Sequence, residues 1–306
     1  MSVKSLGKAE LREGLVARES GDHKGIFGHV LIVAGSRGMA GAAILAARGA
    51  LRSGAGLVTV ASPSGVAGTV ASAVPSAMTL GLPENTAGSF RPEGVDRIKE
   101  YVKERRVTTM AIGPGMTTHA DAARFVLLAL SGVPVAAVVD ADALNTLAQQ
   151  EIDGVVQMLK ARKQPCVFTP HPAEAARLLG MKKTDVEAQR LKCVEKLTRS
   201  LGGVALLKGR KTLISSGART VANNTGGPGL GKAGSGDVLT GLIAGLWAQM
   251  LASGRVSGDL PFRAAALGAW LHGAAGDAAE KELTAWAMTS TDLVDYLPQA
   301  FKALCD

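Results

Sequence analysis

Short apolar runs rich in β-branched residues alternate with segments of helical periodicity along most of the chain. The runs are apolar at successive positions, as in residues 135–139, so a strand built from them is covered on both faces. Such coverage is typical of a parallel sheet enclosed by helices. We expect strands at residues 29–34, 57–61, 78–82, 109–113, 135–140, 166–169, 204–208, 212–215 and 220–223.

The segments between these runs carry a helical repeat and predict helices at residues 41–53, 94–104, 120–130, 143–150, 174–179, 185–201, 235–251, 262–281 and 291–304. Strands that alternate with helices predict a three-layer α/β/α sandwich with a mostly parallel central sheet. No linker, low-complexity segment or internal repeat divides the sequence, so we expect residues 1–306 to form a single domain. Ligands of such sheets bind beyond the carboxyl ends of the strands, and functional residues are expected there.

The net charge of +8 favours an anionic partner, either nucleic acid or a small anionic metabolite. The basic residues form no continuous tract, and they lack the interleaved aromatic residues of a surface on which bases stack. We therefore expect an anionic metabolite as partner and no nucleic acid.

The sequence has the pattern of neither a signal peptide nor a membrane-spanning helix. Residues 1–24 lack the apolar stretch of a signal peptide. The longest apolar stretch, residues 238–252, is shorter than the ~20 residues that cross a bilayer. Three widely spaced cysteines fit a reducing interior. These features predict a cytoplasmic protein with no membrane partner.

A segment with six glycines, Asn223 to Asp237, directly precedes the apolar helical stretch Val238–Leu251. The backbone N–H groups of such a loop can converge on an anion, assisted by the positive end of the helix dipole. Asp237 then lies in the first turn of that helix, where a carboxylate is ordinarily a capping residue. A cap needs no such loop, so the glycines favour a catalytic base. The loop is not a Walker A motif, because no Gly-Lys-Ser/Thr sequence closes it.

Two further segments follow expected strands. Lys208-Gly-Arg-Lys-Thr212 lies between two strands as a tight hairpin. This hairpin is either a solvated turn or a turn whose backbone and basic side chains bind a nucleotide. His171 lies between two prolines in Thr169-Pro-His-Pro-Ala-Glu174, where a ligand-facing side chain and a purely structural one are equally favoured. The other histidines have no metal-ligand spacing, so no transition-metal site is expected.

Asp140-Ala-Asp-Ala-Leu-Asn145 also ends a strand and begins a helix. Asp142 is a candidate N-cap, while Asp140 is a candidate for holding a water molecule or Mg²⁺ near phosphates. After the first strand, Gly35, Gly38 and Gly41 are each three residues apart, which departs from the G-x-G-x-x-G fingerprint of a Rossmann fold. The small-residue helix that follows offers a surface for a bulky ligand.

Taken together, these motifs resemble the ADP- or ATP-dependent NAD(P)H-hydrate dehydratases, a family with a ribokinase-like fold. The resemblance extends from about Gly28 to the C-terminal helix. It is carried by Gly28-His-Val-Leu-Ile-Val-Ala-Gly35, Ala40-Gly-Ala-Ala43, Gly113-Pro-Gly115, Asp140-Ala-Asp-Ala-Leu-Asn145, Thr169-Pro-His-Pro-Ala-Glu174 and Gly234-Ser-Gly-Asp237. Some bacterial relatives carry an N-terminal epimerase domain, which we do not expect in the short segment before Gly28.

The resemblance implies repair of hydrated nicotinamide cofactors. A nucleotide phosphorylates the ring hydroxyl of (6S)-NAD(P)H hydrate, and loss of phosphate regenerates NAD(P)H. Asp237 would be the catalytic base, and Mg²⁺ and ADP or ATP the implied cofactors. The resemblance assigns nucleotide binding to Lys208, Gly209, Arg210, Lys211, Thr212, Gly234, Ser235 and Gly236, and hydrate binding to Ala43, Gly115, His171 and Asp237. It also implies a homo-oligomer, with a tetramer as one arrangement.

The loop before Asp237 departs from the family pattern. The family often has Asn-Pro-Gly-Met-Ala-Thr-Gly-Gly where this chain has Gly227-Pro-Gly-Leu-Gly-Lys-Ala-Gly234. Lys232 is therefore a candidate phosphate contact, and the choices of ADP against ATP and of NADH hydrate against NADPH hydrate stay open. Two alternatives also stay open: a ribokinase-like kinase of a small alcohol or vitamin precursor, and a non-catalytic nucleotide-binding protein, against which Asp237 argues.

Overall fold

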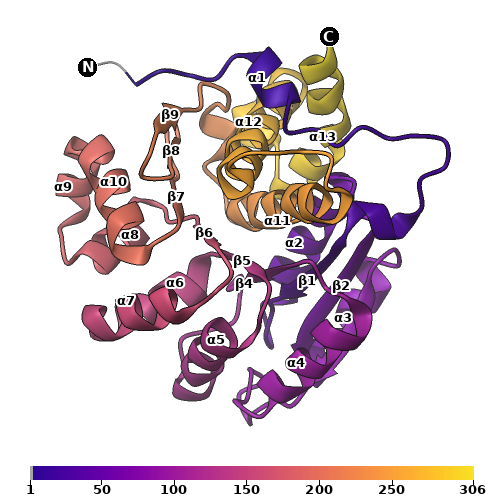
Figure 1. Cartoon of the computed structure of the whole chain (residues 1–306), viewed down its shortest axis with the longest axis vertical. Coiled ribbons are helices and arrows are strands. Elements are labelled where there is room, and N and C mark those ends of the chain that lie inside the picture. The colour runs from indigo at the N-terminus through magenta and orange to yellow at the C-terminus, as the bar shows by residue number, and fades with distance from the viewer. Residues whose placement is uncertain (1–2) are drawn as a thin grey trace.

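The computed structural model describes residues 3–306 as helices packed on both faces of one sheet (Figure 1). The nine strands lie in the order β3-β2-β1-β4-β5-β6-β7-β8-β9. Their bounds are β1 His29–Val33, β2 Leu57–Pro63, β3 Met78–Leu82, β4 Thr109–Ile112, β5 Ala136–Val139, β6 Cys166–Phe168, β7 Val204–Leu207, β8 Leu213–Ser215 and β9 Thr220–Ala222. Every expected strand is confirmed to within two residues at either end.

Neighbouring strands from β3 through β7 pair in parallel, and only β7–β8 and β8–β9 pair antiparallel. The expected three-layer sandwich with a mostly parallel sheet is therefore confirmed. One apolar core lies between the sheet and the helices of residues 40–73 and 235–305, and a second lies on the opposite face beneath the helices of residues 94–201. In the described part of the chain, no helix is long and apolar enough to cross a membrane.

The helices are α1 Lys8–Arg12, α2 Ala40–Arg52, α3 Ser64–Ala73, α4 Gly94–Arg105, α5 Ala120–Gly132, α6 Ala141–Ala148, α7 Ile152–Ala161, α8 Pro172–Leu179, α9 Lys183–Ala188, α10 Arg190–Leu201, α11 Ser235–Ser253, α12 Leu260–Ala287 and α13 Ser290–Cys305. The single helix expected at residues 185–201 is wrong, because Gln189 (φ −125°, ψ 37°) breaks it into α9 and α10. The sequence did not reveal α3 and α7, whose glycines Gly68 and Gly154 weaken the helical signal.

Two small-residue helices, α2 and α11, meet in the centre of one layer. A β-carbon on Gly241 of α11 would collide with the backbone oxygen of Ala46, and one on Gly49 of α2 would collide with that of Val238. The small-residue face of α2 therefore packs on α11 within the chain and offers no free surface to a bulky ligand. This close contact fixes the N-terminal end of α11 above the sheet.

The packing gives a direct prediction for stability. Gly241→Ala should lower the free energy of unfolding by about 1–3 kcal/mol, because backbone has to move to admit the methyl group. The control is Gly68→Ala in α3, where a β-carbon meets nothing within 4 Å; it should raise stability by about 0.4–1 kcal/mol. Urea unfolding of both variants is the measurement, and equal effects of the two substitutions would contradict the packing argument.

Candidate active site

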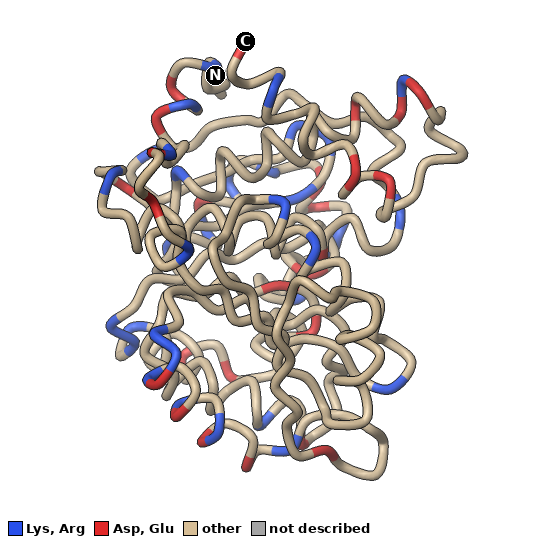
Figure 2. The backbone as a smooth tube through the Cα atoms, turned by 90° about the vertical axis from the view of Figure 1, so that its right-hand side faces the viewer, with Lys and Arg blue, Asp and Glu red and all other residues tan. Residues whose placement is uncertain are grey.

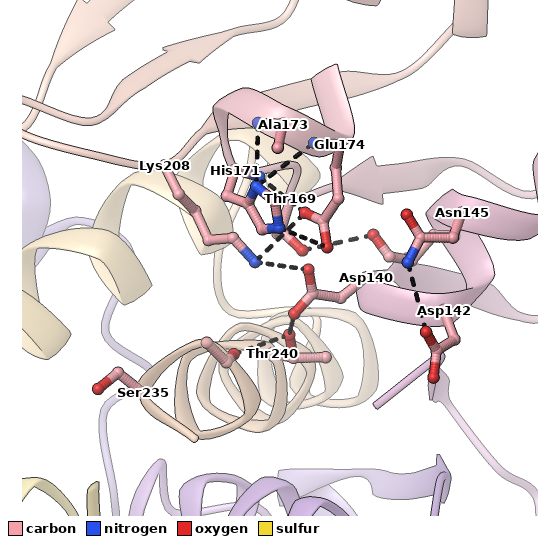
Figure 3. Close-up of polar contacts among 12 residues, drawn as sticks. Asp140, Asp142, Asn145, Thr169, His171, Ala173, Glu174, Lys208, Ser235 and Thr240 are labelled. Carbon is pink, nitrogen blue, oxygen red and sulfur yellow. Dashed lines mark hydrogen bonds and ion pairs between the residues drawn. The ribbon is translucent and has the colours of Figure 1, made fainter. Parts of the chain in front are cut away.

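Several charged side chains converge at the carboxyl edge of the sheet, in front of the N-terminal end of α11 (Figure 3). Asp140 directly follows β5, His171 lies after β6, and Lys208 directly follows β7. These three strands are neighbours and run in parallel, so their carboxyl ends lie side by side. The sheet topology thus brings together three segments that are far apart in the sequence.

Lys208 and Asp140 form a buried ion pair. The Lys208 Nζ atom lies 2.7 Å from Asp140 Oδ1 and 3.9 Å from Glu174 Oε2. The Thr240 hydroxyl on α11 donates to Asp140 Oδ2 at 2.6 Å, so both oxygens of that carboxylate are engaged. Burial alone would lower the pKa of Lys208, but the charges of Asp140 and Glu174 raise it above its ordinary value. Lys208 is therefore held as a cation.

The Lys208 ammonium also lies beside the first turn of α11. A β-carbon on Gly236 would be 3.3 Å from Lys208 Nζ and 3.8 Å from Asp140 Oδ2. Gly234 occupies the N-cap position of α11 with φ 88° and has no side chain with which to cap the helix. The uncapped N–H groups of the first turn, the helix dipole and the lysine together favour an anion at this point.

Asp237 lies in the same first turn and is partly buried. Burial raises the pKa of its carboxyl to about 7, and the negative charge of Asp140 adds to this effect. Near neutral pH such a carboxyl exchanges its proton readily, which is the property required of a general base.

His171 occupies the N-cap position of α8. Its Nδ1 atom accepts from the N–H groups of Ala173 and Glu174 at 3.0 and 3.3 Å, and the Glu174 side chain accepts from the His171 N–H at 2.7 Å in a capping box. Burial lowers the pKa of His171 to about 4, so the ring is neutral and its proton is on Nε2. His171 therefore has a structural role, and its half-exposed ring can donate a hydrogen bond from Nε2 but cannot accept one there.

A cavity of about 720 Å³ adjoins this cluster. Of the residues that the sequence associates with a nucleotide, Lys208, Gly209, Arg210, Thr212, Ser235 and Gly236 line it, whereas Lys211 and Gly234 do not. Asn223 and Thr225 of the glycine-rich segment also line it, as do Leu239, Ala269 and His272, which no sequence motif indicated. Its size falls in the usual range for small-molecule sites, which is roughly 300–1,000 Å³.

His272 could not be found from its sequence context, because it lies inside a helix of mostly small apolar residues. Its Nε2 atom lies 2.8 Å from the backbone oxygen of Ser235, the first residue of α11. Burial lowers the pKa of His272 to about 4, so the ring is neutral and donates to that oxygen. This contact ties α12 to the N-terminal end of α11.

Ala43 and Gly115 lie at a neighbouring part of the same sheet edge, beyond β1 and β4. Ala43 is fully buried beneath the loop after β1, and a β-carbon on Gly35 would lie 3.1 Å from its side chain. Gly115 has φ 62°, and its backbone oxygen accepts from the Ser36 hydroxyl at 2.9 Å. Both residues shape this loop, and neither lines the 720 Å³ cavity.

One expectation about the acidic segment after β5 needs correction. Asp142 is not the N-cap of α6; Asp140 occupies that position, and Asp142 accepts from the Thr117 N–H at 2.9 Å. The Asp140 carboxylate is bound by Lys208 and Thr240, and its expected contact with a water molecule or Mg²⁺ stays a prediction. Within residues 3–306 there is no cluster of three or more His, Cys, Asp or Glu residues suited to a metal ion.

Lys232 does not point at a phosphate position. Its ammonium donates to the backbone oxygens of Trp286 and Met288, each at 2.5 Å, and so joins the glycine-rich loop to the end of α12. The expectation that Lys232 contacts phosphate is therefore not supported by its position.

The chain was compared with known proteins. A family model described as NAD(P)H-hydrate dehydratase matches residues 30–299. The bifunctional NAD(P)H-hydrate repair enzyme Nnr of Moorella thermoacetica is 44% identical over 300 residues, which are 98% of this chain and 54% of that protein. The ADP-dependent (S)-NAD(P)H-hydrate dehydratase of Neisseria meningitidis is 38% identical over 269 residues, with coverage of 85% and 80%. The chain thus spans about half the length of its bifunctional relative.

One solved structure of a protein with the same activity name is similar to this chain in fold and in sequence. The ADP/ATP-dependent NAD(P)H-hydrate dehydratase of Bacillus subtilis, co-crystallised with ATP and Mg²⁺, superposes with a TM-score of 0.81 at 28% identity. The superposition covers 99% of each chain. The similarity therefore extends over the entire sandwich and includes the edge of the sheet at which the charged residues meet.

The raised pKa of Asp237 predicts a stability effect with a definite sign. Its pKa of about 7 in the folded protein lies above the ordinary value of 3.8, so ionisation opposes folding, and this penalty grows as the pH rises from about 4 to 7. Asp237→Asn should therefore be more stable than wild type by about 2 kcal/mol at pH 8, about half of what the full shift implies, because the carboxylate keeps some solvent contact. The two proteins should converge near pH 4 in urea unfolding. If wild type and Asp237→Asn are equally stable at pH 8, ionisation of Asp237 does not oppose folding and the prediction is wrong.

Proposed function

The chain belongs to the NAD(P)H-hydrate dehydratase family, and we propose that it converts (6S)-NADH hydrate and (6S)-NADPH hydrate back to NADH and NADPH with ADP or ATP as phosphoryl donor. The fold is the ribokinase-like α/β/α sandwich. One observation carries the proposal: the Lys208 ammonium and the first turn of α11 form an anion site directly beside the Asp237 carboxylate. An anion site next to a base is what phosphorylation of a hydroxyl requires.

The proposed chemistry replaces a poor leaving group with a good one. Asp237 takes the proton of the ring hydroxyl while that oxygen attacks the terminal phosphoryl group of the nucleotide. The bond from phosphorus to the bridging oxygen breaks, and the shortened nucleotide leaves with that oxygen. Phosphate then leaves the ring carbon with the electron pair of the C–O bond, and loss of a proton from the adjacent carbon forms the double bond of NAD(P)H. The pKa of about 7 suits Asp237 to the first proton transfer.

The transferred phosphoryl group would lie against the N–H groups of residues 234–236 and the Lys208 ammonium. A fixed cation and fixed N–H groups stabilise the spreading negative charge without reorganising during the reaction. Gly209, Arg210 and Thr212 would hold the rest of the nucleotide, because they line the same cavity. Lys211 lies in the same hairpin with φ 54° and would contact the nucleotide from the rim.

The hydrated dinucleotide would approach from the neighbouring strand ends. We assign it to Ala43, Gly115 and His171, together with Asp237. The fixed Nε2–H of His171 would donate to the substrate and cannot act as a base there. Ala43 and Gly115 are both buried, so they would act on the dinucleotide by shaping the loop after β1 against which it lies.

Mg²⁺ would accompany the nucleotide in this proposal. The described residues form no protein cage for it, and Asp140 already has two partners. Mg²⁺ commonly keeps several water ligands and is bound through substrate phosphates with one or two carboxylates, so Asp140 would reach it through water. When bound, the ion neutralises phosphate charge. A homo-oligomer, which rests on the family resemblance, and a cytoplasmic location, which rests on the sequence features described above, are further proposals.

A repair assay tests the proposed function. Purified protein with NADH hydrate or NADPH hydrate, Mg²⁺ and either ADP or ATP should restore the absorbance of the reduced cofactor, and Asp237→Asn should lose this turnover while it still binds nucleotide in calorimetry. A stable phosphoester without NAD(P)H would instead identify a small-alcohol kinase. Nucleotide binding without any turnover would identify a non-catalytic binder.

The neighbourhood of Asp237 predicts the pH dependence of this turnover. The acid limb of kcat/KM should have its midpoint near pH 7, where Asp237 loses its proton. Asp140→Asn removes a negative charge that raises the pKa of Asp237, so the limb should move to lower pH even if the maximal rate also falls. Asp142→Asn is the matched control and should move the limb less, because its charge contributes less to the shift. If the midpoint of the acid limb does not move in Asp140→Asn, the assignment of that limb to Asp237 is wrong.

A further inference from the structure

One face of α12 carries a stripe of four residues at the spacing i, i+3, i+4, i+7: Gly273, Gly276, Asp277 and Glu280. The stripe lies against residues 225–232, which we call the glycine loop. A β-carbon on Gly276 would lie 2.7 Å from the Leu230 side chain, and one on Gly273 would collide with Thr225. The loop therefore rests directly on the helix.

The two carboxylates of the stripe bind backbone N–H groups of the loop. Asp277 accepts from the Gly226 N–H with both oxygens, at 3.1 and 3.0 Å. Glu280 Oε2 accepts from the Gly229 N–H at 2.9 Å, and Gly229 is buried. The glycine N–H groups expected to converge on a bound anion are, at these two positions, directed at the protein's own carboxylates.

Lys232 completes the attachment three residues further on. Its partners, the backbone oxygens of Trp286 and Met288, follow Thr284, whose φ of 68° and ψ of 156° interrupt the helix. The loop is thus fixed to α12 at residues 226, 229 and 232, at every third position.

The glycine loop is also a wall of the 720 Å³ cavity, to which Gly226, Gly227, Pro228, Leu230 and Gly231 contribute. Ala269, His272 and Gly273 of α12 line the same cavity. The contacts that hold the loop therefore determine the shape of the cavity. A loop rich in glycine loses much conformational entropy when it is ordered, so an unattached loop would have to lose it when the ligand binds.

We infer that Asp277 and Glu280 are positioning residues of the nucleotide pocket: their carboxylates hold the glycine loop in its binding shape before the nucleotide arrives. The inference rests on the proposed function, because it takes the cavity to be the nucleotide site. Glu280 has the larger effect, since its partner N–H is buried and would lose its hydrogen bond, whereas Gly226 is exposed to water.

Calorimetry of nucleotide binding tests the inference. Glu280→Ala should weaken the binding of ADP and of ATP by about tenfold, because a charge-assisted hydrogen bond to the loop is lost. Glu280→Gln keeps an acceptor oxygen and should stay within about threefold of wild type. Asp277→Ala, an exposed change that leaves the core intact, should weaken binding by about two- to threefold. Glu282→Ala on the same helix, which removes only a contact with Tyr296, is the matched control and should bind as wild type.

The outcomes separate the inference from the proposed function. If wild type binds nucleotide and Glu280→Ala and Asp277→Ala bind equally well, the carboxylates do not position the loop and the inference is wrong. Tighter binding by these variants would also overturn it, because the carboxylates would then compete with the nucleotide for the loop N–H groups. Wild type that binds neither ADP nor ATP would refute the proposed function itself.

Discussion

The structure of the site depends on one ion pair, between the partly buried Lys208 and the buried Asp140. Loss of Lys208 would leave the buried Asp140 charge uncompensated, so the partners are strongly constrained. Because the pair joins the ends of β5 and β7, and Thr240 links it to α11, three separate elements are held in one arrangement. The anion site at the first turn of α11 is a consequence, since the same lysine faces Gly236.

The position of α11 comes from the close packing of two small-residue helices. Gly49 and Gly241 allow α2 and α11 to approach until backbone meets backbone. On its other side α11 is tied to α12 through His272, and α12 in turn supports the glycine loop. The close packing of α2 and α11 therefore fixes the position of the helix that carries Asp237. The hydrogen bonds of Asp140 then connect this helix to Lys208.

The sequence predicted the parts of this arrangement that depend on local pattern. Successive apolar positions located every strand, and the position of Lys208, His171 and Asp140 after strand ends located the edge at which they meet. The sequence could not predict contacts between residues that lie far apart along the chain. Lys232 looked like a phosphate ligand but contacts backbone oxygens of Trp286 and Met288, and Asp142 looked like the N-cap of α6 but accepts from the Thr117 N–H. No local signal distinguishes these partners.

Along the backbone as a whole, acidic and basic residues are interspersed (Figure 2), whereas the site gathers several acidic groups. Asp140, Glu174 and Asp237 lie around one lysine, and burial raises the pKa of both Glu174 and Asp237 to about 7. A fold selected for stability alone would not gather three carboxylates about a single cation, because like charges at short range oppose folding. The arrangement is understandable if one of these carboxyls must take up a proton near neutral pH, because the neighbouring negative charges help to raise the pKa of Asp237. The cost in stability and the basicity of Asp237 then have the same physical origin.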